Sequence, residues 1–347
     1  MCYDGIKGGI AMSKITDRYE PKLYETDQTR YALTPAMERL LLKDHLCFQE
    51  EIITKIDNKD ICRILTGYLQ YRRDQDPYLL GSELTEAFEK NQKRRTSSYR
   101  MRFGRELTDL ICSFDFSREE GFVSRILVEK LLSDYCSLPY AEREKIYFYE
   151  TYLTIMECIR DQTELQIRVR SVPGDVRTFT YKPCLLCMDE NSLLCYLAGY
   201  SREAGKGGKF SIYAVRLQRI ISAYNTKEES NLTKDKQAEI QERIDEYGIA
   251  YINQTEMEPI TVALTENGYL KYLKIMLHQR PLPSEPVKAG DEEFPYILKF
   301  QCSHYQIENY FFSFGADAKI LSPPELADRF AARYAEAAAR YDSKAYE

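Results

Sequence analysis

Short apolar runs of the kind found in β-strands occupy the middle of the chain. Four of them follow one another, at residues 167–169, 179–183, 193–200 and 210–220. Residues 173–175, Pro-Gly-Asp, form a turn sequence between the first two, and a loop rich in glycine and lysine separates the last two. β-Branched and aromatic runs punctuated by Gly, Pro, Asn and Asp are typical of a small antiparallel barrel. The pattern therefore predicts such a barrel between Arg168 and Ile220.

Helical periodicity dominates the chain before and after this region. Thr34, followed by Pro35, is a good helix start, and the apolar spacing continues from there to Ile56. Further helices are predicted over residues 59–72, 142–160 and 233–247. Residues 1–30 are polar and without periodicity, so we expect them to be loosely ordered.

Residues 97–137 combine one amphipathic strand with two helices. The strand alternates strictly, with apolar residues on one face and polar residues on the other: Tyr99, Met101 and Phe103 against Ser98, Arg100 and Arg102. A helix over residues 105–114 follows, and Ser117 with Glu120 forms a capping box that opens a second helix. One strand and two helices cannot bury the apolar strand face alone. We therefore expect the strand to pair with that of a second copy, in a homodimer.

This unit resembles the ribbon-helix-helix fold, in which two chains pair their strands into a ribbon. In that fold the outward ribbon side chains enter a DNA groove, and the second helix binds phosphate at its N-terminus. The resemblance implies nucleic-acid contacts by Ser98, Arg100, Arg102, Ser117 and Arg118. The alternative is a ribbon that only dimerises and has a solvated basic face.

The last third of the chain predicts a separate α/β module. A strand over residues 258–264, a helix over 269–277, a strand over 296–301 and a helix over 307–312 precede a final helix over 326–341. Residues 310–326 closely resemble the C-terminal extension found behind WYL domains, with a Ser-Phe-Gly turn, a strand and a Pro-x-Glu-Leu helix start. The order of elements implies a ferredoxin-like sandwich.

Charge is distributed unevenly. The chain has 347 residues and a net charge of −6, yet residues 91–105 contain six Lys and Arg residues and no acid. Residues 228–258 are rich in Glu and Asp. An acidic protein with concentrated basic patches directs an anionic partner to those patches.

The sequence offers no recognisable catalytic or metal centre. Cys184 and Cys187 form a C-x-x-C, but no second pair follows at zinc spacing and the chain has three histidines. Gly199 with Gly205-Lys206 departs from a phosphate loop in spacing, and Gly207 stands where Ser or Thr is needed. We expect no catalytic residue, no metal and no cofactor. With no apolar run near membrane length, we expect a cytoplasmic protein.

The third and fourth apolar runs resemble the WYL-domain family. Cys195-Tyr196-Leu197 stands where the family has Trp-Tyr-Leu, and residues 213–220 match its aromatic-x-x-Arg-Leu-x-Arg-Ile strand. In that family the domain is an Sm-like barrel whose basic pocket binds nucleic acid or nucleotide-type ligands. The resemblance implies these contacts in the barrel: Arg168, Arg170, Lys182, Tyr196, Tyr200, Arg202, Lys206, Lys209, Tyr213, Arg216 and Arg219. Strand alternation separates Arg216 from Arg219 unless the chain bends or bulges near Gln218 or the strand ends by Arg219. We therefore expect Arg216 in the site beside Tyr196, and Arg219 at its rim.

Together these features predict an α+β protein of four parts. They are a helical extension (1–90), a ribbon-helix-helix (91–140), a WYL barrel (141–226), and a linker helix with the C-terminal extension (227–347). The combination resembles the WYL accessory proteins of type VI-D CRISPR systems, which implies binding of single-stranded RNA and stimulation of an RNA-guided RNase effector. A ligand-responsive, DNA-binding transcriptional repressor is the alternative, with duplex DNA bound through the ribbon.

Overall fold

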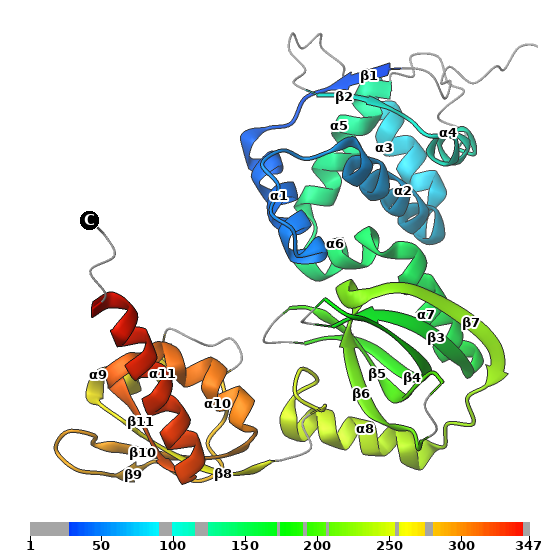
Figure 1. The fold of residues 1–347 in the computed structure, drawn as a ribbon. Helices are drawn as coiled ribbons and strands as arrows, with labels where there is room; N and C mark the ends of the chain where they lie inside the picture. Colours follow the sequence, from blue (N-terminus) through cyan, green and yellow to red (C-terminus); the bar gives the residue numbers. More distant parts are fainter. Residues whose placement is uncertain are drawn as a thin grey trace, which may run out of the picture. The chain divides into compact units, whose positions relative to one another are not determined.

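The computed structural model describes residues 28–89, 99–114, 124–171, 174–189, 193–205, 208–253, 257–274 and 280–342. The chain divides into two compact units, residues 1–152 and 153–347 (Figure 1). Helices dominate the first unit, and two antiparallel sheets with their covering helices make up the second. The predicted α+β class is confirmed.

The first unit contains two short strands and a set of helices. In chain order these are β1 (Gln28–Tyr31), α1 (Pro35–Gln49), α2 (Asn58–Gln75), α3 (Pro77–Glu89), β2 (Tyr99–Arg102), α4 (Arg105–Cys112), α5 (Ser124–Ser137), α6 (Tyr140–Tyr147) and α7 (Tyr149–Asp161), which continues into the second unit. The single helix predicted over 142–160 is wrong, because Phe148 leaves helical geometry and separates α6 from α7.

The start of α1 is as predicted, and its end is not. The Thr34 hydroxyl accepts a hydrogen bond from the Met37 amide at 3.2 Å, which satisfies an amide that the first helical turn leaves unpaired. The helix ends at Gln49 because Glu50 adopts a left-handed conformation with φ of 55°. Ile52 consequently lies in a loop and is 84% exposed, so the predicted continuation to Ile56 is wrong.

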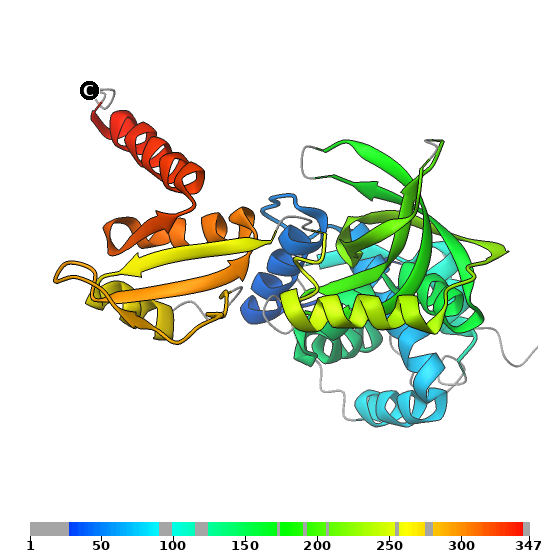
Figure 2. The ribbon, with the colours of Figure 1, turned by 90° about the horizontal axis from the view of Figure 1, so that it is seen from below.

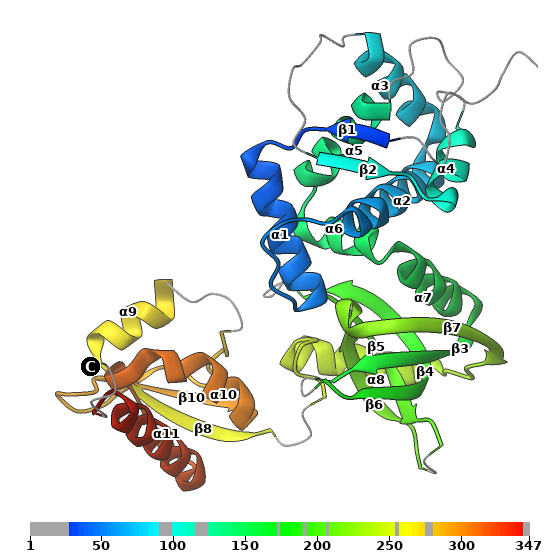
Figure 3. The same ribbon diagram turned by 45° about the horizontal axis from the view of Figure 1, so that its top comes forward.

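Strand β2 finds its partner within the same chain. It pairs antiparallel with β1, Tyr31 opposite Tyr99 and Arg30 opposite Arg100, and Figure 3 shows the two strands side by side. The apolar face is buried against the helices, with Met101 1% exposed. The premise that the apolar face of this strand has no partner within its own chain is therefore wrong, and pairing with a second copy stays a prediction. Residues 28–31 complete the ribbon, although we expected residues 1–30 to be loosely ordered.

One hydrophobic core runs through the whole first unit. It joins side chains from α1 and α2, such as Leu41 and Ile64, to side chains from α4 and α5, such as Leu110 and Leu131. The helical extension and the strand-helix-helix segment therefore fold together, with no break in the core at residue 90.

The first sheet of the second unit has five antiparallel strands. These are β3 (Thr163–Arg170), β4 (Val176–Met188), β5 (Cys195–Glu203), β6 (Ser211–Arg216) and β7 (Ile220–Glu229), in the sheet order β6-β5-β4-β3-β7. A 3₁₀ turn, η4 (Leu217–Arg219), separates β6 from β7. The expected antiparallel strands are present, but the fourth apolar run is divided between two of them.

Close packing inside this sheet explains why residue 199 is a glycine. A Cβ on Gly199 would lie 2.2 Å from the Lys182 carbonyl oxygen and 2.7 Å from Cε1 of Tyr181. Tyr181 is fully buried, and its hydroxyl donates to the Leu197 carbonyl at 3.0 Å. The ring of Tyr181 thus fills the space that Gly199 leaves empty on the inner face.

Helix α8 (Lys234–Tyr247) covers the opposite, outer face of this sheet. Figure 2 shows the helix lying across the strands. Ile240 of the helix packs with Tyr196, Ala198 and Tyr200 of β5 in a second core cluster. Burial of this face holds α8 against the sheet.

The C-terminal module is a four-stranded antiparallel sheet with helices. It contains β8 (Glu258–Leu264), α9 (Glu266–Lys274), β9 (Lys288–Ala289), β10 (Tyr296–Cys302), α10 (His304–Phe311), η5 (Phe312–Asp317), β11 (Ala318–Ser322) and α11 (Pro324–Asp342). The sheet order β11-β8-β10-β9 and the βαββαβ succession are those of a ferredoxin-like sandwich. Gly315, at φ of 61°, supplies the turn before β11.

Candidate nucleic-acid interface

A cluster of aromatic and cationic residues lies on the inner face of the barrel sheet. The rings of Phe179 on β4 and Tyr213 on β6 stack, with centroids 5.5 Å apart and planes at 23°. Burial raises the pKa of Tyr213, and the positive charges of Arg219 and Arg177 partly oppose that rise. The charges of both arginines therefore reach the Tyr213 hydroxyl, and Arg177 stands two residues before Phe179 on the same face of β4. We call Arg177, Phe179, Tyr213 and Arg219 the barrel cluster.

The cluster depends on the end of β6. Arg216 is the last residue of that strand, and Arg219 belongs to the 3₁₀ turn that follows. The condition that the strand ends before Arg219 is thus met. The turn carries Arg219 toward Tyr213, whereas Arg216 stays in strand register opposite Tyr196.

Arg216 contacts Tyr196 as expected. Its Nε donates to the Tyr196 hydroxyl at 3.0 Å, and its guanidinium carbon lies 5.8 Å from the ring centroid. Tyr196 is only 4% exposed, however, and packs in the cluster beneath α8. Tyr196 therefore orients Arg216 and does not offer a free ring face.

Tyr200 is likewise buried under α8. Its hydroxyl donates to Oε2 of Glu239 on α8 at 2.5 Å, and burial together with that carboxylate raises its pKa above the usual range. Tyr196 and Tyr200, which the resemblance placed among the contacts of the barrel, therefore offer no open ring face to a base, because both are buried in the cluster that includes α8.

A second cationic group surrounds Phe210. The Nζ atom of Lys182 lies 4.6 Å from the ring centroid, and the guanidinium carbon of Arg202 lies 4.7 Å from it. Lys182 also binds the carboxylate of Glu164 at 3.3 Å and the carbonyl of Ser230 at 2.7 Å. Lys182 is therefore engaged in structure, whereas Arg202 is exposed.

The remaining barrel residues of the prediction are dispersed. Arg168 and Arg170 are exposed on β3, on the face opposite Ile167 and Val169. Lys209 is exposed before β6, and Lys206 lies outside the described residues. The structure thus brings Arg219 and Tyr213 together and leaves Arg168, Arg170 and Lys209 separate from them.

The ribbon presents a third basic surface. Arg100 and Arg102 are exposed on β2, and Arg30 of β1 lies directly across from Arg100. Ser98, Ser117 and Arg118 lie outside the described residues. We call Arg30, Arg100 and Arg102 the ribbon arginines.

Four residues of these surfaces, Arg30, Arg177, Phe179 and Phe210, were not among the sequence-based candidates. Arg177 and Phe179 were detectable, since they continue the alternation of β4 on the face of Tyr181. Arg30 stands in a four-residue strand within a polar stretch, where no local signal marks it. Cys195, which replaces the motif tryptophan, is 1% exposed and lies on the inner face with Leu197, so this position belongs to the core.

The described parts of the chain contain no group of three His, Cys, Asp or Glu side chains arranged to hold a metal ion. None of the helices in those parts is long and apolar enough to cross a membrane. What the geometry offers is binding by stacking and by positive charge.

Comparison with known proteins agrees with the architecture. Residues 277–338 match the family model of the WCX domain, as expected for the extension behind a WYL domain. A solved structure titled "Crystal structure of a CRISPR Cas-related protein" is similar over 93% of this chain and 96% of that one, with a TM-score of 0.67 and 21% sequence identity. No curated protein matches the chain.

A second solved structure is similar in part only. Proteasome accessory factor B/C (PafBC) of Arthrobacter aurescens matches over 71% of this chain and 37% of that one, at 16% identity and a TM-score of 0.28. A score this low does not establish a shared fold. Residues 277–338 thus match the WCX domain, and the chain has the fold of the CRISPR Cas-related protein.

Proposed function

We propose that this chain is a non-catalytic regulatory protein that binds single-stranded RNA and stimulates the RNA-guided RNase of a type VI-D CRISPR system in the cytoplasm. The observation that carries the proposal is the stacked pair Phe179 and Tyr213 with Arg177 and Arg219 beside it. Proteins hold single strands by combining positive charge with aromatic rings, because every base offers a face on which to stack.

The proposed link to a CRISPR system is supported by the fold. Similarity to a CRISPR Cas-related protein extends over nearly the whole chain, so it includes the first unit, the barrel and the WCX domain together. A regulatory protein of this kind acts on the effector that does the cutting. The absence of a recognisable catalytic motif in the sequence agrees with such a role.

We also propose that the protein is a homodimer. The original argument for a dimer, a ribbon strand without a partner, no longer holds, since β1 pairs with β2 in one chain. The resemblance to the ribbon-helix-helix fold, in which two chains pair their strands, remains in favour of two copies. Light scattering at micromolar concentration tests this, and a mass of one chain contradicts it.

A DNA-binding repressor is the second candidate. The ribbon arginines favour it, because guanidinium groups on a two-stranded ribbon suit contacts to phosphate and to guanine in a duplex groove. In this reading the barrel binds the ligand that controls repression.

Two titrations at one stated salt concentration separate the candidates. Labelled single-stranded RNA should bind more tightly than random duplex DNA, and the protein should increase the rate of RNA cleavage by a type VI-D effector. A tenfold preference for the duplex, about 1.4 kcal/mol, favours the repressor. RNA binding without any change in cleavage rate contradicts the accessory role while leaving RNA binding in place.

A further inference from the structure

Helix α8 covers only part of the outer face of the barrel sheet. The side chains packed with Ile240 of this helix come from β5, from Ala214 of β6 and from the second half of β4. Among the described residues, none of β3 or β7 belongs to that cluster. The outer face over these two strands is open to solvent, and three side chains of β3 are exposed there: Gln166, Arg168 and Arg170.

The strand register places one row of side chains across this open part of the sheet. Tyr224 of β7 lies opposite Gln166 of β3, which in turn lies opposite Thr180 of β4. Arg202 of β5 continues the row beside Thr180. Neighbouring strands are about 4.8 Å apart, so the row spans roughly 14 Å. We call these four residues, with Arg168 from the next row, the outer surface.

Tyr224 offers an open aromatic ring on this surface. The residue is 67% exposed, and its ring contacts no other ring or cation among the described residues. Arg168 lies opposite Ser222, two residues before Tyr224, and is therefore its diagonal neighbour across the strand pair. Long and aromatic side chains reach each other over that spacing. A flat group stacked on Tyr224 would thus have a guanidinium beside it.

Positive charge prevails on the outer surface. Arg168 and Arg202 are exposed, and neither forms an ion pair with a residue that the structure describes. The carboxylate of Glu164, in the next row of β3, is already bound to Lys182 at 3.3 Å. The charge left for a partner is therefore cationic, which complements an anionic strand.

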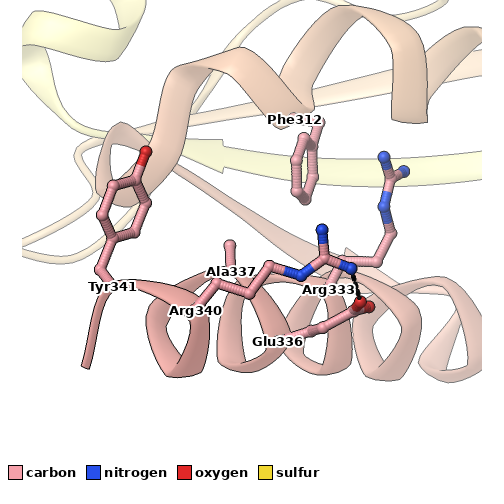
Figure 4. A pocket seen from close by; sticks show the side chains of 6 residues that line it. All are labelled: Phe312, Arg333, Glu336, Ala337, Arg340 and Tyr341. Carbon is pink, nitrogen blue, oxygen red and sulfur yellow. Dashed lines mark hydrogen bonds and ion pairs between the residues drawn. The ribbon is translucent and has the colours of Figure 1, made fainter. Parts of the chain in front are cut away.

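A hollow beside helix α11 contains the same types of residue but lacks an open ring face beside its arginine. Phe312 has the guanidinium carbon of Arg333 at 4.0 Å from its centroid and stacks on Tyr334 at 4.6 Å. Both faces of Phe312 are thus covered, and Figure 4 shows this ring between Arg333 and Tyr341. Tyr341 is 86% exposed, so it serves as a control for Tyr224.

We propose that the outer surface binds a second stretch of the single-stranded RNA, with one base stacked on Tyr224 and with phosphates contacted by Arg168 and Arg202. Unpaired RNA bases stack readily on exposed aromatic side chains of a sheet. This inference rests on the proposed function, because it extends the path of the RNA beyond the barrel cluster.

The β3–β4 hairpin connects the two stretches. Arg177 of the barrel cluster is on the inner face of β4, and the next residue, Thr178, is on the outer face opposite Arg168. Both positions are close to the end of the hairpin. The RNA therefore passes round this end from the barrel cluster to the outer surface.

A fluorescent reporter tests the stacking directly. The chain contains no tryptophan, so Tyr224→Trp places a single one on the outer surface. Titration of this full-length variant with oligouridine of about 16 nucleotides, the upper end of the site sizes of small barrels, should quench its emission. Inorganic phosphate should not quench it. Tyr341→Trp carries the same reporter outside the outer surface, and oligouridine should leave its emission unchanged.

Binding of labelled oligouridine gives the matched measurement. Tyr224→Ala should weaken binding roughly fivefold or more, the loss expected for one stacked base, whereas Tyr224→Phe keeps the ring and should bind as the unmodified protein does. Arg168→Ala should also weaken binding and lower the salt slope by about 0.7. Tyr341→Ala should have no effect.

The outcomes separate this inference from the proposed function. If the unmodified protein binds oligouridine while Tyr224→Trp is not quenched and Tyr224→Ala binds normally, the outer surface is not part of the site and the proposed function stands. If Tyr224→Ala weakens binding but Arg177→Ala with Arg219→Ala does not, the outer surface holds the RNA and the barrel cluster does not. Quenching by duplex DNA but not by oligouridine, or no binding of oligouridine at all, contradicts both.

Discussion

Arg30 and Arg100 lie directly opposite each other across the antiparallel pair of β1 and β2. Both are exposed, and neither forms an ion pair within the part of the chain that the structure describes. Like charges at opposed positions on neighbouring strands are destabilising. The ribbon tolerates this arrangement because the other face is firmly buried through Tyr31 and Met101. A basic surface of this kind is suited to an anionic partner.

Because the ribbon forms within one chain, disrupting it should unfold the first unit and not merely separate two copies. Met101→Asp places an unpaired charge in the core and should lower the free energy of unfolding by about 3–5 kcal/mol. Arg102→Asp, on the exposed face of the same strand, should change it by less than about 0.5 kcal/mol. Chemical denaturation measures both. If Met101→Asp keeps its stability and yields folded monomers, the result would contradict this expectation and favour a ribbon shared between two chains.

Gly199→Ala should destabilise the barrel. The new Cβ meets the Lys182 carbonyl and the Tyr181 ring, both held in the core, at distances that force one of them to move. Overpacking of this kind costs about 1–3 kcal/mol. Gly208→Ala is the matched control, since a Cβ there meets nothing within 4 Å. Equal denaturation midpoints for the two variants would mean that the inner face is looser than described.

Stability should fall in alkaline solution. Burial and a hydrogen bond to Glu38 raise the pKa of Tyr99 to about 12, and burial raises that of Tyr310 to about 12. In the unfolded chain these phenols ionise near pH 10. The folded state therefore retains protons that the unfolded state loses, so their contribution is complete below pH 10 and decreases as the pH rises toward 12.

Denaturation midpoints at pH 9, 10 and 11 test this expectation. The midpoint should decrease from pH 10 upward, and Tyr310→Phe should reduce the decrease. A midpoint independent of pH over that range is the contrary result.

Local patterns predicted the features that depend on neighbouring residues. The alternation of Tyr99 and Met101 and the cap at Thr34 both follow from short-range chemistry. Strand β1 did not follow from such patterns, because its four residues acquire their structure only by pairing with residues 99–102.

Contacts between segments distant in sequence also decided the candidate site. Tyr196 and Tyr200 had the composition of a stacking surface, but α8, which begins at Lys234, returns to cover them. The alternation along β4 puts Phe179 and Arg177 on the inner face. Their place beside Tyr213, however, depends on how the sheet brings β4 and β6 together there. Which side of a small sheet stays open is decided by segments distant in sequence.

The measurement that tests the central claim most directly compares two sets of substitutions in titrations of labelled single-stranded RNA over a range of salt concentrations. Arg177→Ala with Arg219→Ala removes the charge of the barrel cluster, and alanine at all three ribbon arginines removes that of the ribbon. The barrel variant should bind RNA of any sequence more weakly, and the slope of log K against log salt should decrease by about 0.7 for each RNA phosphate that the variant no longer neutralises. The ribbon variant should retain RNA binding. If instead the ribbon variant fails to bind RNA while the barrel variant binds it normally, the barrel is not the RNA site.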